Sequence, residues 1–494
     1  MSRRLAALAA ALLAGVSVAY ASAACAKDSV TIGMTLEPPG LDPTTKPAAA
    51  IGEIVHYNVF EGLTKINEDF SVTPLLADSW TFSKDLKTLT LNLKKGVKFQ
   101  DGEPFTSKDV KFSFERFAAK GSTNKDKPFF ASIKSIDASD PAKVTLTFAE
   151  PSFAALTHLG YNTAVILDEK SAGDEANHPV GTGPYKLASW NKGASLTLDA
   201  WDGYREPAKI AIKHATFKFI SDSAAQAAAV ESGDIDAFPR IDASSIAQFK
   251  DNPRFQVLIG GTEGKTILAM NNRKAPLNDL KVRQAIAYAL DRKAIIDGAS
   301  NGLGTPIGSH LTPNDPGYVD LTGMYPHDPA KAKALLKEAG VKTPLDLTLT
   351  LPPPAYARQG GQIIAAELAD VGIQAKIENV EWAQWLSNVY TNHNFDLTII
   401  SHVEPLDIAI YANPNYYFGY DSKSFQAIIK KWEEAPDLAA YKAALVEAQK
   451  KLAEDCVNAF LFQLPNVTVA DAKLQGLWKN APIFVNDLSA MSWK

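Results

Sequence analysis

The sequence predicts mixed α/β domains, because stretches with the period of a strand alternate with stretches with the period of a helix. Residues 76–116 show the change of period most clearly. Leucines at 89, 91 and 93 alternate with polar residues, which is typical of a half-buried strand. After a turn signal at 100–102, Thr106 precedes Asp109 at the spacing of a capping box. Apolar residues at 110, 114 and 117 follow at helical spacing, so this stretch predicts a strand, a turn and a helix.

The same two patterns recur along the rest of the chain. Further strands are predicted at 30–34, 144–148, 164–167, 185–190, 196–198, 216–220, 266–270, 345–351, 374–380 and 397–400. Helices are predicted at 51–60, 151–159, 224–232, 280–296, 329–339, 361–371, 382–390 and 441–454. This alternation, with some pairs that look like hairpins, supports mixed α/β domains.

Length and composition indicate a soluble protein of more than one domain. The 494 residues are ample for two or three domains with separate cores. Apolar residues make up 46% of the chain and charged residues 21%, which is ordinary for a globular protein. The formal net charge is −5, and the sequence has no long basic run. We therefore expect no nucleic-acid partner.

The first 26 residues have the features of a cleavable secretory signal peptide. Arg3 and Arg4 precede an apolar run at 5–18, and small residues at 21–26 offer cleavage sites. The run is too short to favour a membrane span, and no later stretch is long and apolar enough for one. The mature protein is therefore expected to be exported and soluble.

Cys25 lies at the cleavage boundary, and its fate depends on the cleavage site. A lipid-modified cysteine normally follows a large aliphatic residue three positions earlier, where this chain has Ser22, so a lipid anchor is not expected. Cleavage after Ala26 leaves Cys456 as the single cysteine, whereas cleavage after Ala23 leaves a Cys25–Cys456 bridge open. Stability is expected to come from the core rather than from crosslinks.

The sequence offers little for catalysis or metal binding. Residues 298–302 match the string of a nucleophile elbow, but that motif needs a strand before the serine, and Ser300 follows a predicted helix. The eight histidines form no HxxxH pair, and no CxxC occurs. The glycines at 181 and 183 precede a strand rather than a helix, which disfavours phosphate binding. We expect no enzymatic activity, no metal site and no cofactor.

Five stretches form a joint pattern along the chain, and the strand–turn–helix stretch at 76–116 is one of them. The other four are EPPGLDP at 37–43, PVGTGPY at 179–185 with a tryptophan at 190, VRQAI through DR at 282–292, and AQKKLAEDCVNAFLFQLPNVTVA at 448–470. In this order they resemble the peptide-type extracytoplasmic solute-binding proteins of family 5. These are the receptors of dipeptide, oligopeptide and nickel ABC importers.

The resemblance implies a large, class II periplasmic binding protein fold with two lobes and an extra subdomain inserted in lobe one. Residues 27–263 and 472–494 would form lobe one, with the subdomain at about 62–180, and residues 264–471 would form lobe two. Two crossings, near 264–270 and 465–470, would form the hinge. The resemblance further implies a monomer in the periplasm that delivers a small-molecule or peptide ligand to the permease subunits of an ABC transporter in the inner membrane.

Residues 351–420 are rich in aromatic side chains, which suit the apolar walls of a ligand cleft. The candidate ligand-binding residues are Glu37, Tyr356, Arg358, Trp382, Trp385, His402, Glu404, Asp407, Tyr411, Tyr416 and Tyr417. The alternative is that these rings belong to the core. Peptide-binding members of the family hold the ligand amino group with an Asp that the matching segment at 398–405 lacks. Only His402 lies where nickel-binding members hold their metal.

The charged candidates predict a ligand with two charged ends. Glu404, Asp407 or Glu37 is expected to pair with a cationic group, and the alternative is that Glu404 only positions its own loop. Arg358 precedes the predicted helix at 361–371 and is expected to hold a carboxylate, or alternatively to pair with a neighbour such as Glu367. The ligand would be a short or modified peptide or an amino-acid conjugate.

Two other functions remain open from the sequence. The protein could be a binding module that feeds a chemoreceptor or sensor, which would need the same cleft. It could also be a periplasmic hydrolase that uses Ser300 as nucleophile.

Overall fold

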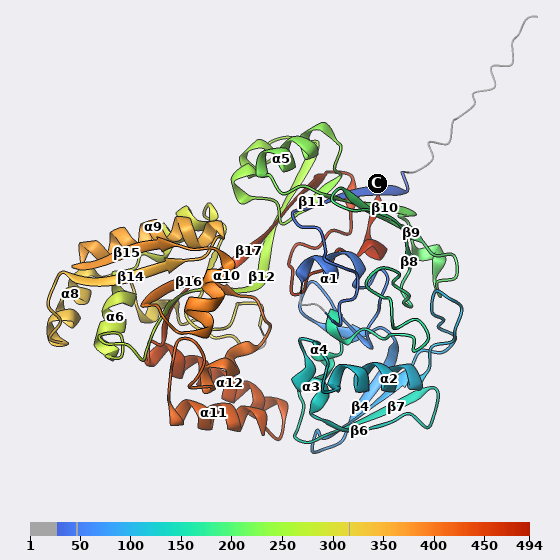
Figure 1. Cartoon of the computed structure of the whole chain (residues 1–494), viewed down its shortest axis with the longest axis horizontal. Helices are drawn as coiled ribbons and strands as arrows, with labels where there is room; N and C mark the ends of the chain where they lie inside the picture. Colours follow the sequence, from blue (N-terminus) through green and yellow to red (C-terminus); the bar gives the residue numbers. More distant parts are fainter. Residues whose placement is uncertain (1–26, 46–47, 316) are drawn as a thin grey trace, which may run out of the picture.

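A computed structural model describes residues 27–45, 48–315 and 317–494. The predicted signal peptide and Cys25 lie outside the described residues. Figure 1 shows two bodies side by side, connected by the long strands β12 (Phe255–Met270) and β17 (Asn458–Asp471). Strands and helices alternate along the chain, so the prediction of mixed α/β domains is confirmed. In the described part of the chain, no helix combines the length and the apolar character needed to cross a membrane.

One eleven-stranded sheet passes through both lobes in the order β15-β14-β16-β12-β17-β11-β1-β10-β9-β8, with β13 (Thr305–Pro306) beside β17. Its lobe-one strands are β1 (Ser29–Met34), β8 (Tyr185–Asn191), β9 (Ser195–Ala200), β10 (His214–Phe219) and β11 (Ala237–Pro239). Its lobe-two strands are β14 (Leu345–Leu351), β15 (Ile373–Asn379) and β16 (Leu397–His402). Because β12 and β17 belong to both halves, they are the only sheet strands of the described chain that tie the lobes together.

The pairing of β12 with β17 is interrupted where the chain passes between the lobes. Residues 255–261 pair with 465–471, residues 265–269 pair with 458–463, and the register shifts between Gly261 and Lys265. The chains approach closely here, since a Cβ on Gly264 would lie 2.7 Å from the Cβ of Leu464. This irregularity lies a few residues before the crossing expected at 264–270. The lobe boundaries given above stay a prediction.

The stretch at 76–116 forms part of a separate four-stranded sheet in the order β4-β5-β7-β6. Its strands are β4 (Ala77–Phe82), β5 (Thr88–Leu93), β6 (Ile133–Asp137) and β7 (Lys143–Phe148), and its helices are α2 (Ser107–Ala118) and α3 (Lys127–Ala131). Thr106 and Asp109 form the predicted capping box at the start of α2. Val110, Phe114 and Phe117 are fully or almost fully buried, and each contributes about 1.5–3 kcal/mol by its burial.

Further lobe-one elements surround this sheet and the large one. They are α1 (Ala49–Val55), β2 (Thr64–Ile66), β3 (Val72–Pro74), α4 (Ala155–His158), η1 (Asn162–Ala164), η2 (Pro207–Lys209), α5 (Ser223–Ser232), η3 (Ala243–Gln248), β18 (Leu474–Gln475), η7 (Leu488–Ala490) and β19 (Ser492–Trp493). Lobe one has its own large core, and a smaller cluster packs α5 and β11 against the end of β17.

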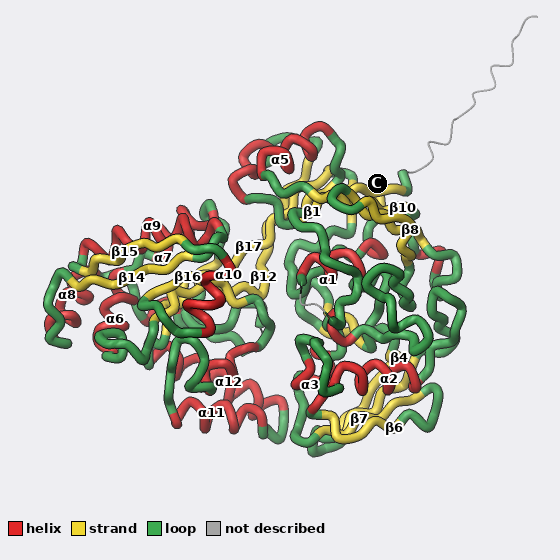
Figure 2. The backbone as a smooth tube through the Cα atoms, viewed as in Figure 1, coloured by secondary structure: helices red, strands yellow, loops and turns green. Residues whose placement is uncertain are grey.

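Helices cover the lobe-two strands, and Figure 2 shows α11 and α12 on the side that faces the lobe-one subdomain. The helices of lobe two are α6 (Leu280–Ala289), α7 (Arg292–Ser300), η4 (Thr322–Met324), α8 (Pro329–Glu338), α9 (Ala355–Asp370), α10 (Trp382–Trp385), the π-helical turn η5 (Leu386–Thr391), η6 (Asp407–Ala412), α11 (Lys423–Glu433) and α12 (Leu438–Glu454). Two buried clusters, one on each side of the sheet strands, form the core of this lobe.

Several predicted elements are wrong in detail; the helix expected at 51–60, for example, ends at Val55. The single helix expected at 280–296 is two helices, because the Asp291 side chain accepts hydrogen bonds from the N–H groups of Lys293 and Ala294 and caps a new helix there. The strand expected at 164–167 is absent, although its four side chains are buried. The helix expected at 361–371 begins six residues earlier, at Ala355, directly after the proline run.

Candidate ligand-binding site

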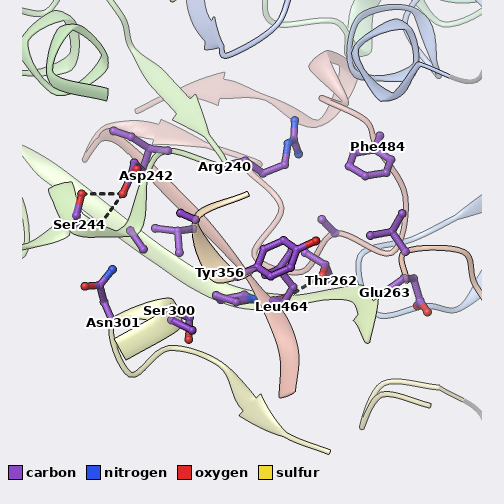
Figure 3. Close-up of a pocket in the computed structure, with 18 of the residues that line it drawn as sticks. Arg240, Asp242, Ser244, Thr262, Glu263, Ser300, Asn301, Tyr356, Leu464 and Phe484 are labelled. Carbon is purple, nitrogen blue, oxygen red and sulfur yellow. Dashed lines mark hydrogen bonds between the residues drawn. The ribbon is translucent and has the colours of Figure 1, made fainter. Parts of the chain in front are cut away.

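A cavity of about 380 Å³ lies between the lobes, against the irregular part of the β12–β17 ribbon (Figure 3). Lobe one contributes residues 240–244 and 481–484. The crossing strands contribute Thr262, Glu263, Leu464, Pro465 and Val467, and lobe two contributes residues 299–301, Ala355, Tyr356, Gln359 and Val403. Its volume falls in the range of small-molecule sites, and closure of two lobes on one cavity is the geometry of a binding protein.

The charged groups on the lobe-one side already have partners. Arg240 has a positive φ of 57° and extends its guanidinium to Glu53, at 2.8 Å. Asp242 is the N-cap of η3, and it accepts hydrogen bonds from the backbone N–H of Ser244 at 2.9 Å and from its hydroxyl at 2.7 Å. Both side chains therefore shape the wall of the cavity, with the Arg240 charge compensated by Glu53 and the Asp242 carboxylate hydrogen-bonded by Ser244.

The lobe-two wall is built from the start of α9 and the end of α7. The N–H of Ser401 donates to the hydroxyl of Tyr356 at 3.1 Å, so the hydroxyl hydrogen stays free to donate. Burial raises the pKa of Tyr356 to about 12, which keeps the phenol neutral. Ser300 donates to the carbonyl of Ile296 at 2.9 Å and accepts from the N–H of Gly304 at 3.1 Å. Its hydroxyl thus closes the last turn of a helix and has no histidine bonded to it.

Two neighbouring residues on β12 face the cavity from the crossing. The Thr262 hydroxyl donates to the carbonyl of Leu464 at 2.8 Å and accepts from the N–H of Gly264 at 2.9 Å. Glu263 is only 4% exposed, and its Oε2 atom has no hydrogen-bond partner. Burial, and next the nearby Asp315 carboxylate, raise the pKa of Glu263 well above its ordinary value.

The predicted residues Asp407 and His402 belong to a buried cluster behind the cavity wall. The Asp407 carboxylate lies 2.9 Å from Lys265 Nζ and 3.1 Å from His310 Nε2, and its other oxygen lies 3.7 Å from His402 Nδ1. Lys265 also donates to the carbonyl of Glu404 at 2.5 Å. The cluster therefore connects the loop after β16, which contains Glu404 and Asp407, to Lys265 on the crossing strand β12.

Charges in this cluster balance within the protein. Burial opposes the Asp407 charge, but Lys265 and the two histidines outweigh it and hold the pKa of Asp407 far below its ordinary value. Burial likewise opposes the Lys265 charge, yet Asp407 and Glu263 raise the pKa of Lys265. Burial, and next His310, lower the pKa of His402 to about 4, so this ring is neutral near pH 7. The result is one ion pair between two neutral imidazoles.

The same cluster meets the distance criterion for a metal site, with the ligand atoms of His310, His402 and Asp407 within 4.8 Å of one another. The residues do not fit a metal ion well, because the Lys265 ammonium already occupies the place of a cation beside Asp407 Oδ1. The tyrosine hydroxyls of Tyr411 and Tyr417 are also bonded to the outer ring nitrogens, each at 3.0 Å. The expectation of no metal site stays a prediction.

Among the eleven predicted ligand-binding residues, Tyr356 is the one that lines the described cavity. Trp385, Tyr411 and Tyr417 are almost fully buried and pack in one cluster with Tyr416, as the alternative interpretation of a core had it. Trp382 is 44% exposed on the surface of lobe two. Ligand contact by these rings stays a prediction without support from the lining of the cavity.

Three charged candidates have partners of their own. Glu37 accepts hydrogen bonds from the indole of Trp190 at 2.9 Å and from the N–H of Gly193 at 3.0 Å. Glu404 pairs with Lys125 of lobe one at 3.1 Å. Arg358 lies 3.3 Å from Glu381, rather than beside Glu367.

The residues that sequence reasoning missed are Arg240, Thr262, Glu263, Gln359 and the segment 481–484. One signal was available for the crossing. Glycines at 260, 261 and 264 interrupt the strand between the apolar residues at 257–259 and 267–270, which indicates a bulge or a close approach of backbones. The rest have no local signature, because they come together only through the arrangement of the lobes.

The lobes also touch at the side away from the crossing strands. The rings of Phe153 in lobe one and Tyr441 on α12 lie 4.9 Å apart between centroids. The Lys125–Glu404 ion pair connects the same two bodies. The lobes therefore meet at two places, along the crossing strands and at this contact.

Comparison with known proteins identifies the family. The model described as bacterial extracellular solute-binding proteins, family 5 Middle, matches residues 71–424. This chain is a family 5 solute-binding protein. The resemblance seen in the five sequence stretches is thus confirmed. A related family member, the glutathione-binding protein GsiB of Salmonella choleraesuis, is 30% identical over 383 residues, which cover 76% of this chain and 73% of GsiB.

Solved structures of other binding proteins share the fold. The PBP AgaA of A. tumefaciens R10, in complex with agropinic acid, is 27% identical, with a TM-score of 0.79 and coverage of 94% of this chain and 99% of AgaA. The ABC transporter substrate-binding protein CtaP of Listeria monocytogenes reaches a TM-score of 0.85 at 22% identity, covering 95% of this chain and 99% of CtaP. The predicted two-lobed periplasmic binding protein fold is confirmed.

Proposed function

We propose that this family 5 protein is the periplasmic binding component of an ABC importer, and that it encloses a short or modified peptide or an amino-acid conjugate between its lobes. The observation that carries the proposal is the cavity of about 380 Å³, whose walls come from both lobes and from the crossing strands. A ligand there touches both lobes at once, so its binding energy favours the closed form that a permease can distinguish from the open form.

The walls suit a ligand that is part apolar and part polar. Ile241, Leu464, Val467, Ile483 and Phe484 give apolar surface, while the hydroxyl of Tyr356 and the amide of Gln359 give hydrogen-bonding groups. The names of two relatives, a glutathione-binding protein and a complex with agropinic acid, support a small amino-acid-derived ligand. The absence of the family's Asp from segment 398–405 argues that the amino group, where one is present, is held elsewhere.

The remaining parts of the proposal follow from the same role. The protein acts as a monomer in the periplasm, where a cleaved signal peptide delivers it, and it catalyses no reaction. Ser300 gives no support to a hydrolase, since its hydroxyl is used at the end of α7. Transport energy comes from the ABC transporter and not from this protein.

The test uses two tryptophan substitutions on the same helix. Ala355 lines the cavity, and Ala366 is exposed on α9 outside its lining. Wild type, Ala355→Trp and Ala366→Trp are purified in parallel, and retained ligand is measured by native mass spectrometry. We expect ligand on wild type and on Ala366→Trp, and an empty Ala355→Trp. Retention of equal ligand by Ala355→Trp would contradict the placement of the site.

Closure is tested separately by small-angle scattering. Unfolding and dialysis remove the ligand, and the refolded protein is measured with and without the ligand found by mass spectrometry. The radius of gyration is expected to be smaller with ligand. An unchanged profile at saturation counts against closure of the lobes.

A further inference from the structure

Three ion pairs lie in the walls of the cavity or close behind them. Arg240 pairs with Glu53 at 2.8 Å, Lys265 pairs with Asp407 at 2.9 Å, and Lys125 pairs with Glu404 at 3.1 Å. Each of these three cations thus has an acid of its own. None of the three forms an ion pair with an acid in the lining of the cavity, although Lys265 interacts with Glu263 electrostatically from beyond ion-pair distance.

Glu263 is such an acid. It lines the cavity, it is 96% removed from solvent as its exposed fraction of 4% shows, and its Oε2 atom accepts no hydrogen bond. Within the described residues, no Lys, Arg or His nitrogen lies within ion-pair distance of its carboxyl group. A buried polar atom without a partner is rare and unfavourable, so a hydrogen bond from a ligand group to this oxygen would be stabilising.

A second acid increases the demand for a cation at this position. The carboxyl group of Asp315 lies close enough to Glu263 to hydrogen-bond with it and to raise its pKa. Asp315 itself is buried, and its Oδ2 atom accepts hydrogen bonds from the N–H of Thr312 at 2.6 Å and from the Thr312 hydroxyl at 3.0 Å. These bonds hold the Asp315 carboxyl group in place beside Glu263. A cation beside Glu263 would relieve the repulsion between the two groups.

The backbone fixes the position of Glu263. It lies in the interval 262–264, where β12 leaves the register of β17, so its carboxyl group belongs to neither lobe alone. The Thr262 hydroxyl bonds and the tight packing of Gly264 hold this turn of the strand. Figure 3 shows Glu263 at one end of the cavity and Asp242 and Ser244 at the other. A ligand group bound to Glu263 would therefore lie at the crossing between the lobes.

We propose that Glu263 is the specificity-determining acid of the site and that it binds a cationic nitrogen, an ammonium or a guanidinium, of the ligand. The proposal rests on the proposed function and assigns a different residue from the acids expected from the sequence. Glu37, Glu404 and Asp407 each hold partners within the protein, and Asp242 is occupied by Ser244. Glu263 lines the cavity, forms no ion pair, and has no hydrogen-bond partner for its Oε2 atom among the described residues.

The test compares free amines with their acetylated analogues. A panel of di- and tripeptides that includes glutathione, each paired with its N-acetyl analogue, is titrated into ligand-free protein by calorimetry. The proteins are wild type, Glu263→Gln, Glu263→Asp and the control Glu404→Gln, which removes a neighbouring acid that Lys125 already pairs. Thermal unfolding of each variant confirms that it is folded.

Loss of one partner of a desolvated charge pair at an interface costs on the order of 30-fold in affinity or more. Wild type and Glu404→Gln should therefore prefer the free amine by about that factor, Glu263→Gln should bind both forms alike, and Glu263→Asp should keep part of the preference. Equal binding of both forms by wild type, or an undiminished preference in Glu263→Gln, would overturn this inference while leaving the proposed function in place. Failure of every peptide to bind wild type would contradict both.

Discussion

Replacing Asp407 by Asn tests whether the buried cluster serves the fold or the ligand. The substitution keeps the size of the side chain and removes its charge, so the Lys265 ammonium, which is fully buried, loses its counter-ion. One carbonyl, that of Glu404, remains as its recorded partner. Breaking a buried pair on one side costs about 3–5 kcal/mol, because the remaining charge is left in a poorly polarisable interior. We expect Asp407→Asn to lower the free energy of unfolding by that amount.

The assay is urea unfolding followed by tryptophan fluorescence at pH 7, with Glu404→Gln as the control. The control removes an ion pair whose side chains are both more than 40% exposed, and such pairs contribute about 0–1 kcal/mol. Because the pKa of Asp407 is lowered on folding, its contribution is present above the unfolded pKa of about 3.9 and is lost as the pH falls below it. The difference between wild type and Asp407→Asn should therefore shrink in acid.

A double-mutant cycle uses Lys265→Met, Asp407→Leu and the variant that carries both. The double variant leaves neither charge unpaired, so it should be more stable than the sum of the two single changes predicts. The reasoning fails if the free energy of unfolding of Asp407→Asn lies within about 1 kcal/mol of that of wild type, because an unpaired buried charge should cost more than that. It also fails if the variant keeps full stability and loses ligand affinity, which would mark Asp407 as a ligand-binding group.

Three further predictions concern pH, the site and closure. Folding lowers the pKa of His402 from 6.5 to about 4, so the unfolded state binds a proton first as the pH falls. Between pH 6.5 and 4, His402 therefore removes about 1.4 kcal/mol of stability per pH unit. The urea midpoints at pH 7 and pH 5 should differ less in His402→Gln than in wild type. Arg358→Ala should bind acids and their carboxamides with the same preference as wild type in calorimetry, since Arg358 pairs with Glu381, and a lost preference would restore the carboxylate role. Phe153→Ala removes an interlobe ring contact worth about 0.5–1.5 kcal/mol, so ligand affinity should fall by up to about tenfold, whereas unchanged affinity would mean that closure does not use this contact.

Local patterns predicted local structure well. The alternation at 89–93 and the capping box at Thr106 depend on neighbouring residues alone, and both are present as predicted. The break at Asp291 was missed because the apolar period continues across it, while the cap depends on one side chain turning back to the backbone. The α/β class followed from the alternation of strand and helix periods, and the family followed from five motifs in one order along the chain.

The site was harder, for a physical reason. Its lining comes from points as far apart as Arg240, Glu263, Tyr356 and Phe484, and no sequence period connects them. Aromatic residues at 411–417 look the same in sequence whether they line a cleft or fill a core, and here Tyr411 and Tyr417 are core. Lys265 stands in an apolar strand like any exposed lysine, and its full burial depends on Asp407, 142 positions away by the difference of the two residue numbers.

The sharing of β12 and β17 by both lobes has a consequence for how the protein is assembled. In the sheet, β17 lies between β12 and β11, so residues 458–471 are needed to join the lobe-one strands to the rest. Nearly all of the other strands are synthesised earlier and must wait for this segment. Contacts of such long sequence separation form slowly and leave strand edges open in the meantime. Completion of this one strand is thus the step at which two partial structures become a single protein.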